Sequence, residues 1–298
     1  MNIIYMTVLT ALAPIIWGST YYLTTEFLPP GQPFLAAAIR CLPAGIFLLA
    51  IFWERVNSAS FKRLFILSIL NISLFQSMLF ISAYNLPGGL ASLIGSLQPA
   101  IVAFLAFVFK NETLSKTKIF MFFTALIGMS LIFVQNSIQW DLLGVIAALI
   151  GAISMSFGTF LSRKWSSNIN LYAFTGYQLV LGGIILLCIS PLYDTYPTNL
   201  EAKNVYGYAY LVVFGAIISY SIWFNGVKKL PLSVASSLGF LSPITAIIIG
   251  WVALNQSLTL TQLAGVGLVL YSLCKIVSPT KPDTPKIVAT KLHKNTFD

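Results

Sequence analysis

Charged side chains are scarce in this chain. Only 8% of its 298 residues are Asp, Glu, Lys or Arg, whereas 57% are apolar and the mean hydropathy is +0.86. A soluble domain carries roughly 25% charged residues, so this composition cannot cover a water-facing surface. The scarcity excludes an ordinary cytosolic enzyme, a disordered protein and a coiled coil. Because the apolar residues form blocks close to the ~20 residues that span a bilayer as a helix, the sequence predicts an all-α membrane protein.

Groups that perform chemistry are also scarce. The three cysteines, Cys41, Cys188 and Cys274, have neither the number nor the spacing of a disulfide framework or a metal site, and each is expected to be a small buried apolar residue. The one histidine, His293, lies in the C-terminal tail, and none of the eight acidic residues falls in the middle of an apolar block. Catalytic or metal-binding clusters therefore cannot be assembled inside the membrane. The sequence predicts no enzyme, no metal site and no cofactor.

Ten apolar blocks, separated by polar segments, predict ten membrane-spanning helices. Continuous apolar blocks argue against a membrane β-barrel, whose strands alternate between polar and apolar residues. Proline interrupts four of the blocks, and such interruptions are tolerated where neighbouring helices satisfy the freed carbonyl groups, often beside a cavity. The prolines are Pro14, Pro43, Pro99 and Pro243. The expected helices cover residues 4–25, 33–53, 64–84, 88–109, 118–136, 142–162, 170–190, 206–226, 232–254 and 261–277.

The basic residues are distributed unequally between the two sides of this arrangement. If the N-terminus is cytoplasmic, 15 of the 17 Lys and Arg residues fall on the cytoplasmic side, Lys203 lies in an outside loop and Arg40 lies within the second span. This asymmetry predicts ten spans with both termini cytoplasmic. The net charge of +9 then reports orientation, and nucleic-acid binding is not expected. Residues 278–298 are expected to form a basic, disordered cytoplasmic tail.

The chain contains an internal repeat. Residues 86–117 are identical to the residues 144 positions further on at 11 of 32 positions without a gap, and a weaker match at a shift of 138 pairs Gly45 with Gly183. The predicted halves are residues 1–138 and 139–277. Because each half holds five spans, an odd number, the halves enter the membrane from opposite sides. Such inverted repeats are typical of alternating-access carriers, whose substrate site lies near the middle of the membrane. The matched pairs include Ser92 with Ser236, Gly95 with Gly239, and Pro99 with Pro243.

Several motifs resemble those of the EamA family in the drug/metabolite transporter superfamily. They are Ala13-Pro-Ile-Ile-Trp17-Gly18-Ser19-Thr20, Arg40, and the Leu-Pro…Ala-Ser…Pro99 pattern that ends in Asn111-Glu112-Thr-Leu. The second half repeats the last pattern with Gln256 where the family commonly has an acid. The resemblance covers residues 4 to 277. It implies a ten-helix carrier of the bacterial inner (plasma) membrane, often an exporter of amino acids, other metabolites or drugs, without specifying the substrate.

Arg40 is the sharpest single feature of the sequence. It lies in the outer third of the second span, where a charge costs roughly 2.5–3.5 kcal/mol or more. Its guanidinium could bind a substrate carboxylate through two hydrogen bonds. Alternatively, it could bind helix carbonyl groups or pair with Glu26 near the outer mouth. The aligned residue in the second half is Gln178, so the two sides of a cavity would differ chemically.

Other polar and aromatic side chains within the spans complete the candidate path. Gln76 and Gln98 are costly to bury, and aromatic rings suit an organic cation or an aromatic group, although they also anchor helices at the membrane interface. The candidate substrate-binding residues are Trp17, Tyr21, Arg40, Gln76, Gln98, Gln178 and Tyr220, and the candidates for gating or coupling are Glu26 and Glu112.

The sequence favours a carrier that exports a small metabolite, such as an amino acid or a related amine or drug-like solute, by alternating access. Its expected partners are that solute and the lipid bilayer, and the carrier is expected to be a monomer or a homodimer. Because no acidic residue or histidine lies within the predicted spans, facilitated diffusion or exchange is favoured over proton coupling. A lipid or lipid-linked sugar flippase and a proton-coupled multidrug exporter remain as alternatives.

Overall fold

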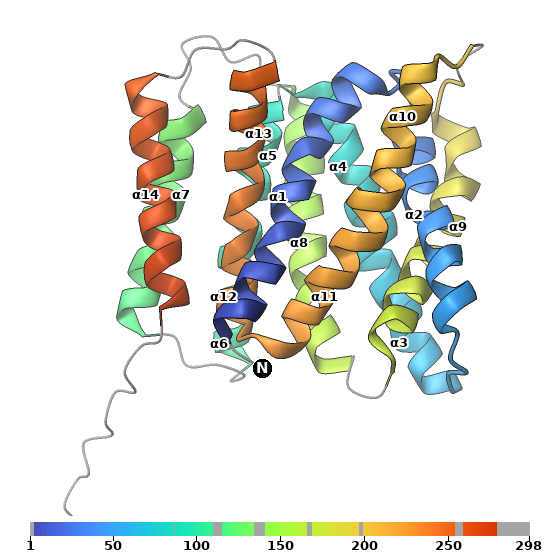
Figure 1. The fold of residues 1–298 in the computed structure, drawn as a ribbon, viewed down its shortest axis with the longest axis horizontal. Helices are drawn as coiled ribbons and strands as arrows, with labels where there is room; N and C mark the ends of the chain where they lie inside the picture. Colours follow the sequence, from blue (N-terminus) through green and yellow to red (C-terminus); the bar gives the residue numbers. More distant parts are fainter. Residues whose placement is uncertain are drawn as a thin grey trace, which may run out of the picture.

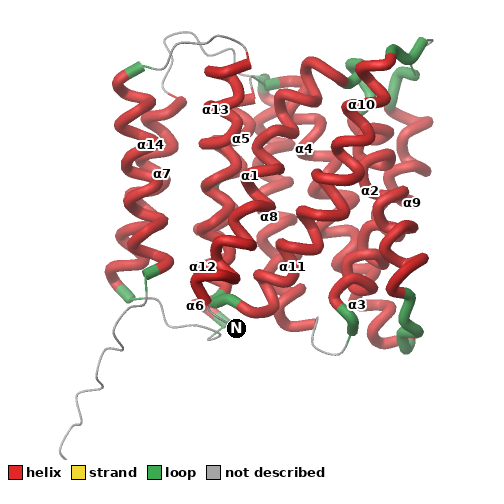
Figure 2. Tube along the Cα trace, in the orientation of Figure 1, coloured by secondary structure: helices red, strands yellow, loops and turns green. Residues whose placement is uncertain are grey.

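The fold is a bundle of helices that run side by side (Figure 1). The computed structural model describes residues 3–86, 88–109, 115–133, 141–165, 169–196, 199–253 and 259–278. These segments contain helices and short connecting loops but no strand (Figure 2). The all-α class expected from the apolar blocks is therefore confirmed.

The helices of residues 3–133 begin with α1 (Ile3–Phe27) and α2 (Pro33–Phe52). A third rod consists of α3 (Ser58–Ser68), the π-helical segment η1 (Ile69–Ser73) and α4 (Leu74–Asn85). They are followed by α5 (Gly88–Gly95), α6 (Leu97–Val108) and α7 (Lys116–Phe133).

The helices of residues 142–277 follow the same order. They begin with α8 (Leu142–Trp165) and α9 (Leu171–Tyr193). The next rod consists of α10 (Ala202–Tyr210), the π-helical segment η2 (Leu211–Ile218) and α11 (Ser219–Lys229). The last elements are α12 (Leu232–Ser237), the 3-10 segment η3 (Leu238–Phe240), α13 (Leu241–Ala253) and α14 (Leu260–Val277).

Nine helical rods in the described segments are long and apolar enough to cross a membrane. They are α1, α2, α3–α4, α5–α6, α8, α9, α10–α11, α12–α13 and α14. The remaining long helix, α7, has 18 residues and packs against α14. The expected count of ten spans stays a prediction.

The α3–α4 and α10–α11 rods begin earlier than their apolar blocks. They start at Ser58 and Ala202, whereas hydropathy placed the starts at 64 and 206. The Asn57 side chain accepts a hydrogen bond from the Ser60 backbone N–H at 2.8 Å, and Glu201 and Asn204 cap each other reciprocally. Such caps satisfy the first N–H groups of a helix, so polar residues extend the helix beyond its apolar stretch.

Proline acts differently at its four positions. Pro14 and Pro43 lie within continuous helices. In contrast, the α5–α6 rod breaks at Ser96 and the α12–α13 rod at residues 238–240, each within a turn before Pro99 or Pro243. A proline ring clashes with the carbonyl group four residues earlier, which explains why both breaks precede the proline.

Helix positions and helix contacts are similar in the two predicted halves. α9 begins 138 residues after α2, and α10, α12 and α14 begin 144 residues after α3, α5 and α7. α2 packs against α9, and α7 packs against α14. α1 contacts α11 and α13, while α8 contacts α4 and α6. Exchanging the halves therefore maps the main helix pairs onto each other.

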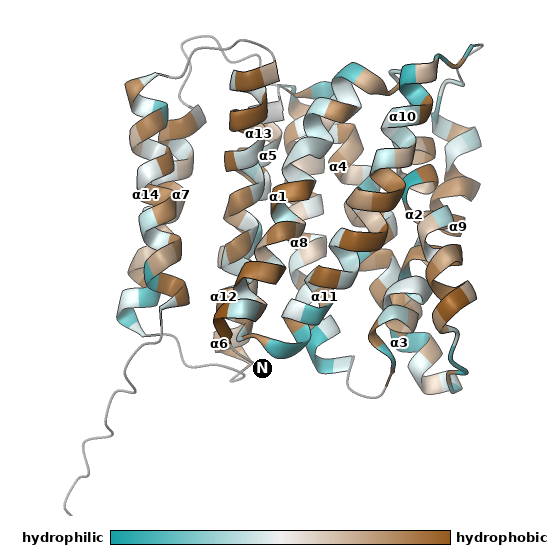
Figure 3. Ribbon diagram, viewed as in Figure 1, coloured by the Kyte–Doolittle hydropathy of each residue, from teal (hydrophilic) through white to brown (hydrophobic). Residues whose placement is uncertain are grey.

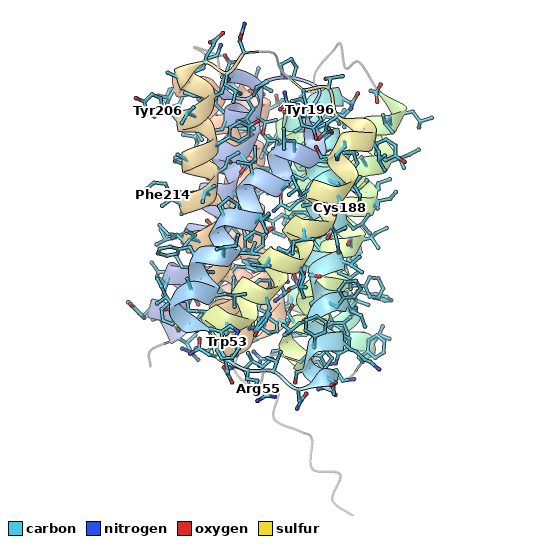
Figure 4. All side chains as sticks on the ribbon, turned by 90° about the vertical axis from the view of Figure 1, so that its right-hand side faces the viewer. Trp53, Arg55, Cys188, Tyr196, Tyr206 and Phe214 are labelled. Atoms are coloured by element: carbon cyan, nitrogen blue, oxygen red, sulfur yellow. The ribbon has the colours of Figure 1, made fainter. Side chains whose placement is uncertain are left out.

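Hydrophobic residues occur along the whole length of the helices, and hydrophilic residues gather at several helix ends, such as the upper end of α10 and the lower end of α11 (Figure 3). Trp53 and Arg55 lie at one end of the bundle, and Tyr196 and Tyr206 lie at the other (Figure 4). The N-terminal end of α1 and the C-terminal end of α14 lie at the same end of the bundle (Figure 1).

The cysteines correct one expectation. Cys41 is buried, as expected, but Cys188 and Cys274 are exposed on α9 and α14. They lie among exposed apolar neighbours such as Ile184 and Leu187. In a membrane bundle an apolar stretch can face lipid as readily as protein, so hydropathy alone did not distinguish these positions.

Candidate functional site

A cavity of about 90 Å³ lies between helices of both predicted halves. This volume holds several water molecules or a small solute. Its wall is mainly apolar and aromatic, with neutral hydroxyl and amide groups. Among the described residues that line the cavity, Arg40 alone carries a charge. The wall includes Trp17, Thr20, Tyr21, Arg40, Ser82, Ser92, Gly95, Gln98, Trp223, Ser242 and Pro243.

The Arg40 guanidinium is buried without an acidic partner in the described part of the chain. Its side chain is 1% exposed. Nη2 donates a hydrogen bond to the Gly215 carbonyl oxygen at 3.0 Å, and Nη1 donates to Gln76 Oε1 at 3.4 Å. Nε has no partner. A guanidinium has five N–H donors. Arg40 therefore retains both its positive charge and spare donors beside the cavity.

The Gly215 carbonyl holds two members of the site in place. It lies in the π-helical segment η2, and its oxygen also accepts a hydrogen bond from Trp17 Nε1 at 3.0 Å. A Cβ at residue 215 would lie 3.3 Å from Arg40 Nε, which is closer than most Cβ contacts. Glycine at this position therefore lets the guanidinium approach the helix. π-helical segments are often found at functional sites.

Gln76 and Tyr220 lie behind the cavity wall. Gln76 Nε2 donates a hydrogen bond to the Tyr220 hydroxyl, and both side chains are completely buried. The Tyr220 ring lies 5.2 Å from the Trp17 ring, and the Trp17 ring lies 5.4 Å from that of Trp223. Neither Gln76 nor Tyr220 is among the lining residues. They position Arg40 and Trp17, which do line the cavity.

Gln178 belongs to a separate buried group. Its Oε1 accepts a hydrogen bond from Asn71 Nδ2 at 2.8 Å, and the same Nδ2 donates to Ser162 Oγ at 3.0 Å. Gln178 Nε2 donates to the Phe174 carbonyl oxygen. Gln178 is fully buried and is not among the residues that line the cavity.

Of the two candidate gating acids, Glu26 is described by the structure and is not among the residues that line this cavity. Glu26 is exposed in the last turn of α1, and the described residues contain no ion pair between it and Arg40. The alternative of an Arg40–Glu26 salt bridge is therefore wrong for this conformation, whereas the alternative of a tie to a helix carbonyl is observed at Gly215. Glu112 lies outside the described residues. The described residues also contain no cluster of three or more His, Cys, Asp or Glu that could hold a metal ion.

Four of the candidate substrate-binding residues, Trp17, Tyr21, Arg40 and Gln98, line the cavity, and their role in binding stays a prediction. Sequence reasoning missed several serines, glycines and prolines, because these residues are more often used for close helix packing. A usable signal was present in the internal repeat. Ser92, Gly95 and Pro243 all belong to the matched pairs and all line the cavity.

Comparisons with known proteins agree with this architecture. The EamA-like transporter family matches the chain twice, at residues 4–134 and 142–278. Protein PecM of Dickeya dadantii is 38% identical over 264 residues, which are 88% of each chain. A WAT1-related chloroplastic protein of Arabidopsis thaliana is 30% identical over 90% of this chain and 68% of its own. A solved crystal structure has the same fold, with a TM-score of 0.76, 16% identity and coverage of 91% of this chain and 96% of its own. This chain is therefore a member of the EamA-like transporter family.

Proposed function

We propose that this transporter is a multi-pass carrier of the bacterial inner membrane that exports a small metabolite by alternating access. The proposal includes ten spans, cytoplasmic termini, and two inverted halves at residues 1–138 and 139–277. The cytoplasmic assignment rests on the distribution of Lys and Arg. The shared end of α1 and α14 in Figure 1 supports an even number of crossings. The two matches to the EamA-like family support the division into halves.

Equivalent contacts across the bundle further support the inverted repeat. Gly45 packs against Val180 and Gly183 packs against Leu42, and these residues are related by a shift of 138. The Arg40–Gly215 hydrogen bond is equivalent to the Gln178–Asn71 hydrogen bond. Gln178 lies 138 residues after Arg40, and Gly215 lies 144 residues after Asn71. The second equivalence pairs a charged group with a neutral amide. The proposed halves therefore share a framework while presenting different chemistry.

The observation that carries the proposal is the cavity between the halves, with a buried arginine in its wall. A carrier needs a site near the middle of the membrane at the interface of its repeats. Because Arg40 has no acidic partner among the described residues, a solute that supplies the negative charge is favoured, since a paired charge is far less costly inside a protein. The rings of Trp17, Tyr21 and Trp223 favour an apolar or aromatic body. Among the solutes considered, amino acids fit this wall better than simple amines.

A resistance screen tests the transport function. Cells that overproduce the chain are challenged with toxic concentrations of single amino acids, their analogues and amines, and the intracellular solute is measured. Export predicts protection together with a lower intracellular level for at least one solute. An Arg40→Met variant at matched membrane abundance is the control and should lose this protection. Wild-type protein that alters neither quantity for any solute in the panel would contradict the proposal.

The solute class is tested with three compounds of similar shape. Phenylalanine carries a carboxylate and an ammonium group, 3-phenylpropionate carries only the carboxylate, and phenethylamine carries only the ammonium group. The carboxylate class predicts that the first two raise the unfolding temperature of the purified protein and that phenethylamine does not. Stabilisation by phenethylamine alone would contradict the assigned class, while leaving the transport function to the resistance screen.

A further inference from the structure

The motif Ala-Ser-x-x-Gly-x-Leu-x-Pro occurs twice, at residues 91–99 and 235–243. Each copy spans one of the two helix breaks, because the first covers the end of α5 and the start of α6, and the second covers α12, η3 and the start of α13. We call these segments the first copy and the second copy. A helix break allows the short helix before it to move separately from the longer helix after it.

The second copy packs against the proline of the first. A Cβ built at Gly239 would lie 3.4 Å from Pro99 Cγ, so the Pro99 ring borders the space that a side chain at residue 239 would occupy. Ser236 Oγ donates a hydrogen bond to the Pro99 carbonyl oxygen at 3.4 Å, and Ser236 is 1% exposed. All six residues of α12 are buried. This side of the interface is closed.

The first copy does not make the equivalent contact. The repeat relates the Gly239–Pro99 contact to a contact between Gly95 and Pro243. A Cβ at Gly95 would meet no heavy atom within 4 Å. Gly95, Gly239 and Pro243 all line the cavity, and Pro99 alone of these four motif residues does not. On this side the cavity occupies the space that the equivalent contact would fill.

Neighbouring helices show the same asymmetry. A Cβ at Gly226 of α11 would lie 2.9 Å from Thr10 Cβ of α1 and still closer to the rest of the Thr10 side chain. Thr10 is completely buried. In the repeat, Ser82 is equivalent to Gly226 (a shift of 144) and Ala148 is equivalent to Thr10 (a shift of 138). Both Ser82 and Ala148 line the cavity. The packing is therefore tight between α1 and α11, whereas the equivalent positions on α4 and α8 border the cavity.

We infer that the two copies of the motif are the alternating gates of the carrier. The second copy closes on Pro99 and seals the cytoplasmic side, as in this structure. When the carrier turns inward, the first copy closes on Pro243 and the second copy separates from Pro99. In each of the two states one of the glycines, Gly95 or Gly239, faces the proline ring of the other copy, and neither has a β-carbon to fill the space between them. The inference rests on the proposed carrier function and names the residues that perform its conformational change.

Two valine variants should hold the carrier in opposite states. Valine at Gly95 fits the open space of this conformation, but its branched side chain would obstruct closure on Pro243. Valine at Gly239 would press on Pro99 and favour separation of the cytoplasmic contact. A control is Gly267→Val in α14, because Gly267 also has no heavy atom within 4 Å of its Cβ position and belongs to neither copy.

Accessibility of single cysteines distinguishes the two states without a known substrate. The native cysteines are first replaced by serine, and Ser82→Cys or Thr10→Cys is introduced as the reporter. A membrane-impermeant maleimide is then applied to the outer or the cytoplasmic side of membrane vesicles. With Gly95→Val, labelling of the residue-82 reporter from outside should be retained or rise, and labelling of the residue-10 reporter from the cytoplasmic side should fall about tenfold. With Gly239→Val, labelling of the residue-82 reporter from outside should fall, and labelling of the residue-10 reporter from the cytoplasmic side should rise.

The inference is overturned if both variants change the two reporters in the same direction, or if neither differs from Gly267→Val. Should Gly239→Val fail to fold, paired cysteines at residues 99 and 239 replace it. Mild oxidation should join them while residue 82 stays accessible from outside, and loss of that accessibility would also overturn the inference. Because labelling needs no solute, these outcomes are separate from a negative resistance screen, which concerns the transport function itself.

Discussion

The Arg40→Lys substitution separates a role in solute binding from a purely structural role. Lysine retains the positive charge and can still donate to the Gly215 carbonyl oxygen, which Arg40 Nη2 reaches at 3.0 Å. It lacks the planar fork that binds both oxygens of a carboxylate. Binding therefore predicts weaker solute affinity in a protein that inserts and folds normally, whereas a structural role predicts loss of folded protein.

The expected size of the effect follows from the hydrogen bond that is lost. A hydrogen bond to a charged group contributes about 1.5–3 kcal/mol. Losing one of the two bonds of a bidentate pair should thus raise the apparent dissociation constant roughly 10- to 150-fold. Gly215→Ala provides a graded comparison, because its Cβ would lie 3.3 Å from Arg40 Nε and displace the guanidinium by a few tenths of an ångström. Its effect on affinity should be smaller than that of Arg40→Lys.

The assay is solute binding to purified protein, with thermal unfolding measured on the same samples. The solute is the one that gives the greatest protection in the resistance screen. Unchanged affinity in a well-folded Arg40→Lys protein would refute the binding role. A folded fraction that falls while the remaining protein binds normally would assign Arg40 to structure alone.

Three further predictions concern packing, helix capping and energy coupling. Gly158→Ala should destabilise the protein by about 1–3 kcal/mol in thermal unfolding, because the new Cβ would lie 2.6 Å from Asn71 Cγ, and unchanged stability would contradict this packing. Arg163→Gln should lower stability by about 2 kcal/mol, since Arg163 Nη1 donates to three carbonyl oxygens at the C-terminal end of α11, and loss confined to transport would contradict a structural cap. In proteoliposomes, a pH gradient should not drive solute accumulation; gradient-driven accumulation that disappears in Glu26→Gln would instead establish proton coupling.

The helices were predictable from the sequence because membrane spans are long, apolar and bounded by polar segments. Helix ends were less predictable where a polar cap extended the helix, as Asn57 does for α3. The π-helical segments η1 and η2 left no mark in the hydropathy pattern. They depend on tertiary contacts such as the approach of Arg40 to Gly215, which sequence periodicity does not encode.

The site was predictable only in part, for a physical reason. Arg40 and Trp17 stand out because a charge or a polar ring inside a membrane needs a partner. Gln178 is just as costly to bury, but its partner Asn71 satisfies it away from the cavity. Small residues such as Gly95 were missed for a different reason. Gly95 borders the cavity because the space beside it is empty, and only the packed structure shows that space.

Counterflow in proteoliposomes tests the central claim of alternating access most directly. Vesicles are loaded with the unlabelled solute identified by the resistance screen and diluted into a trace of the labelled solute. An alternating-access carrier predicts transient accumulation of label above equilibrium, which Gly95→Val abolishes and Gly267→Val leaves intact. Folded wild-type protein that lets the label equilibrate without an overshoot, or that gives the same overshoot with Gly95→Val, would contradict the account.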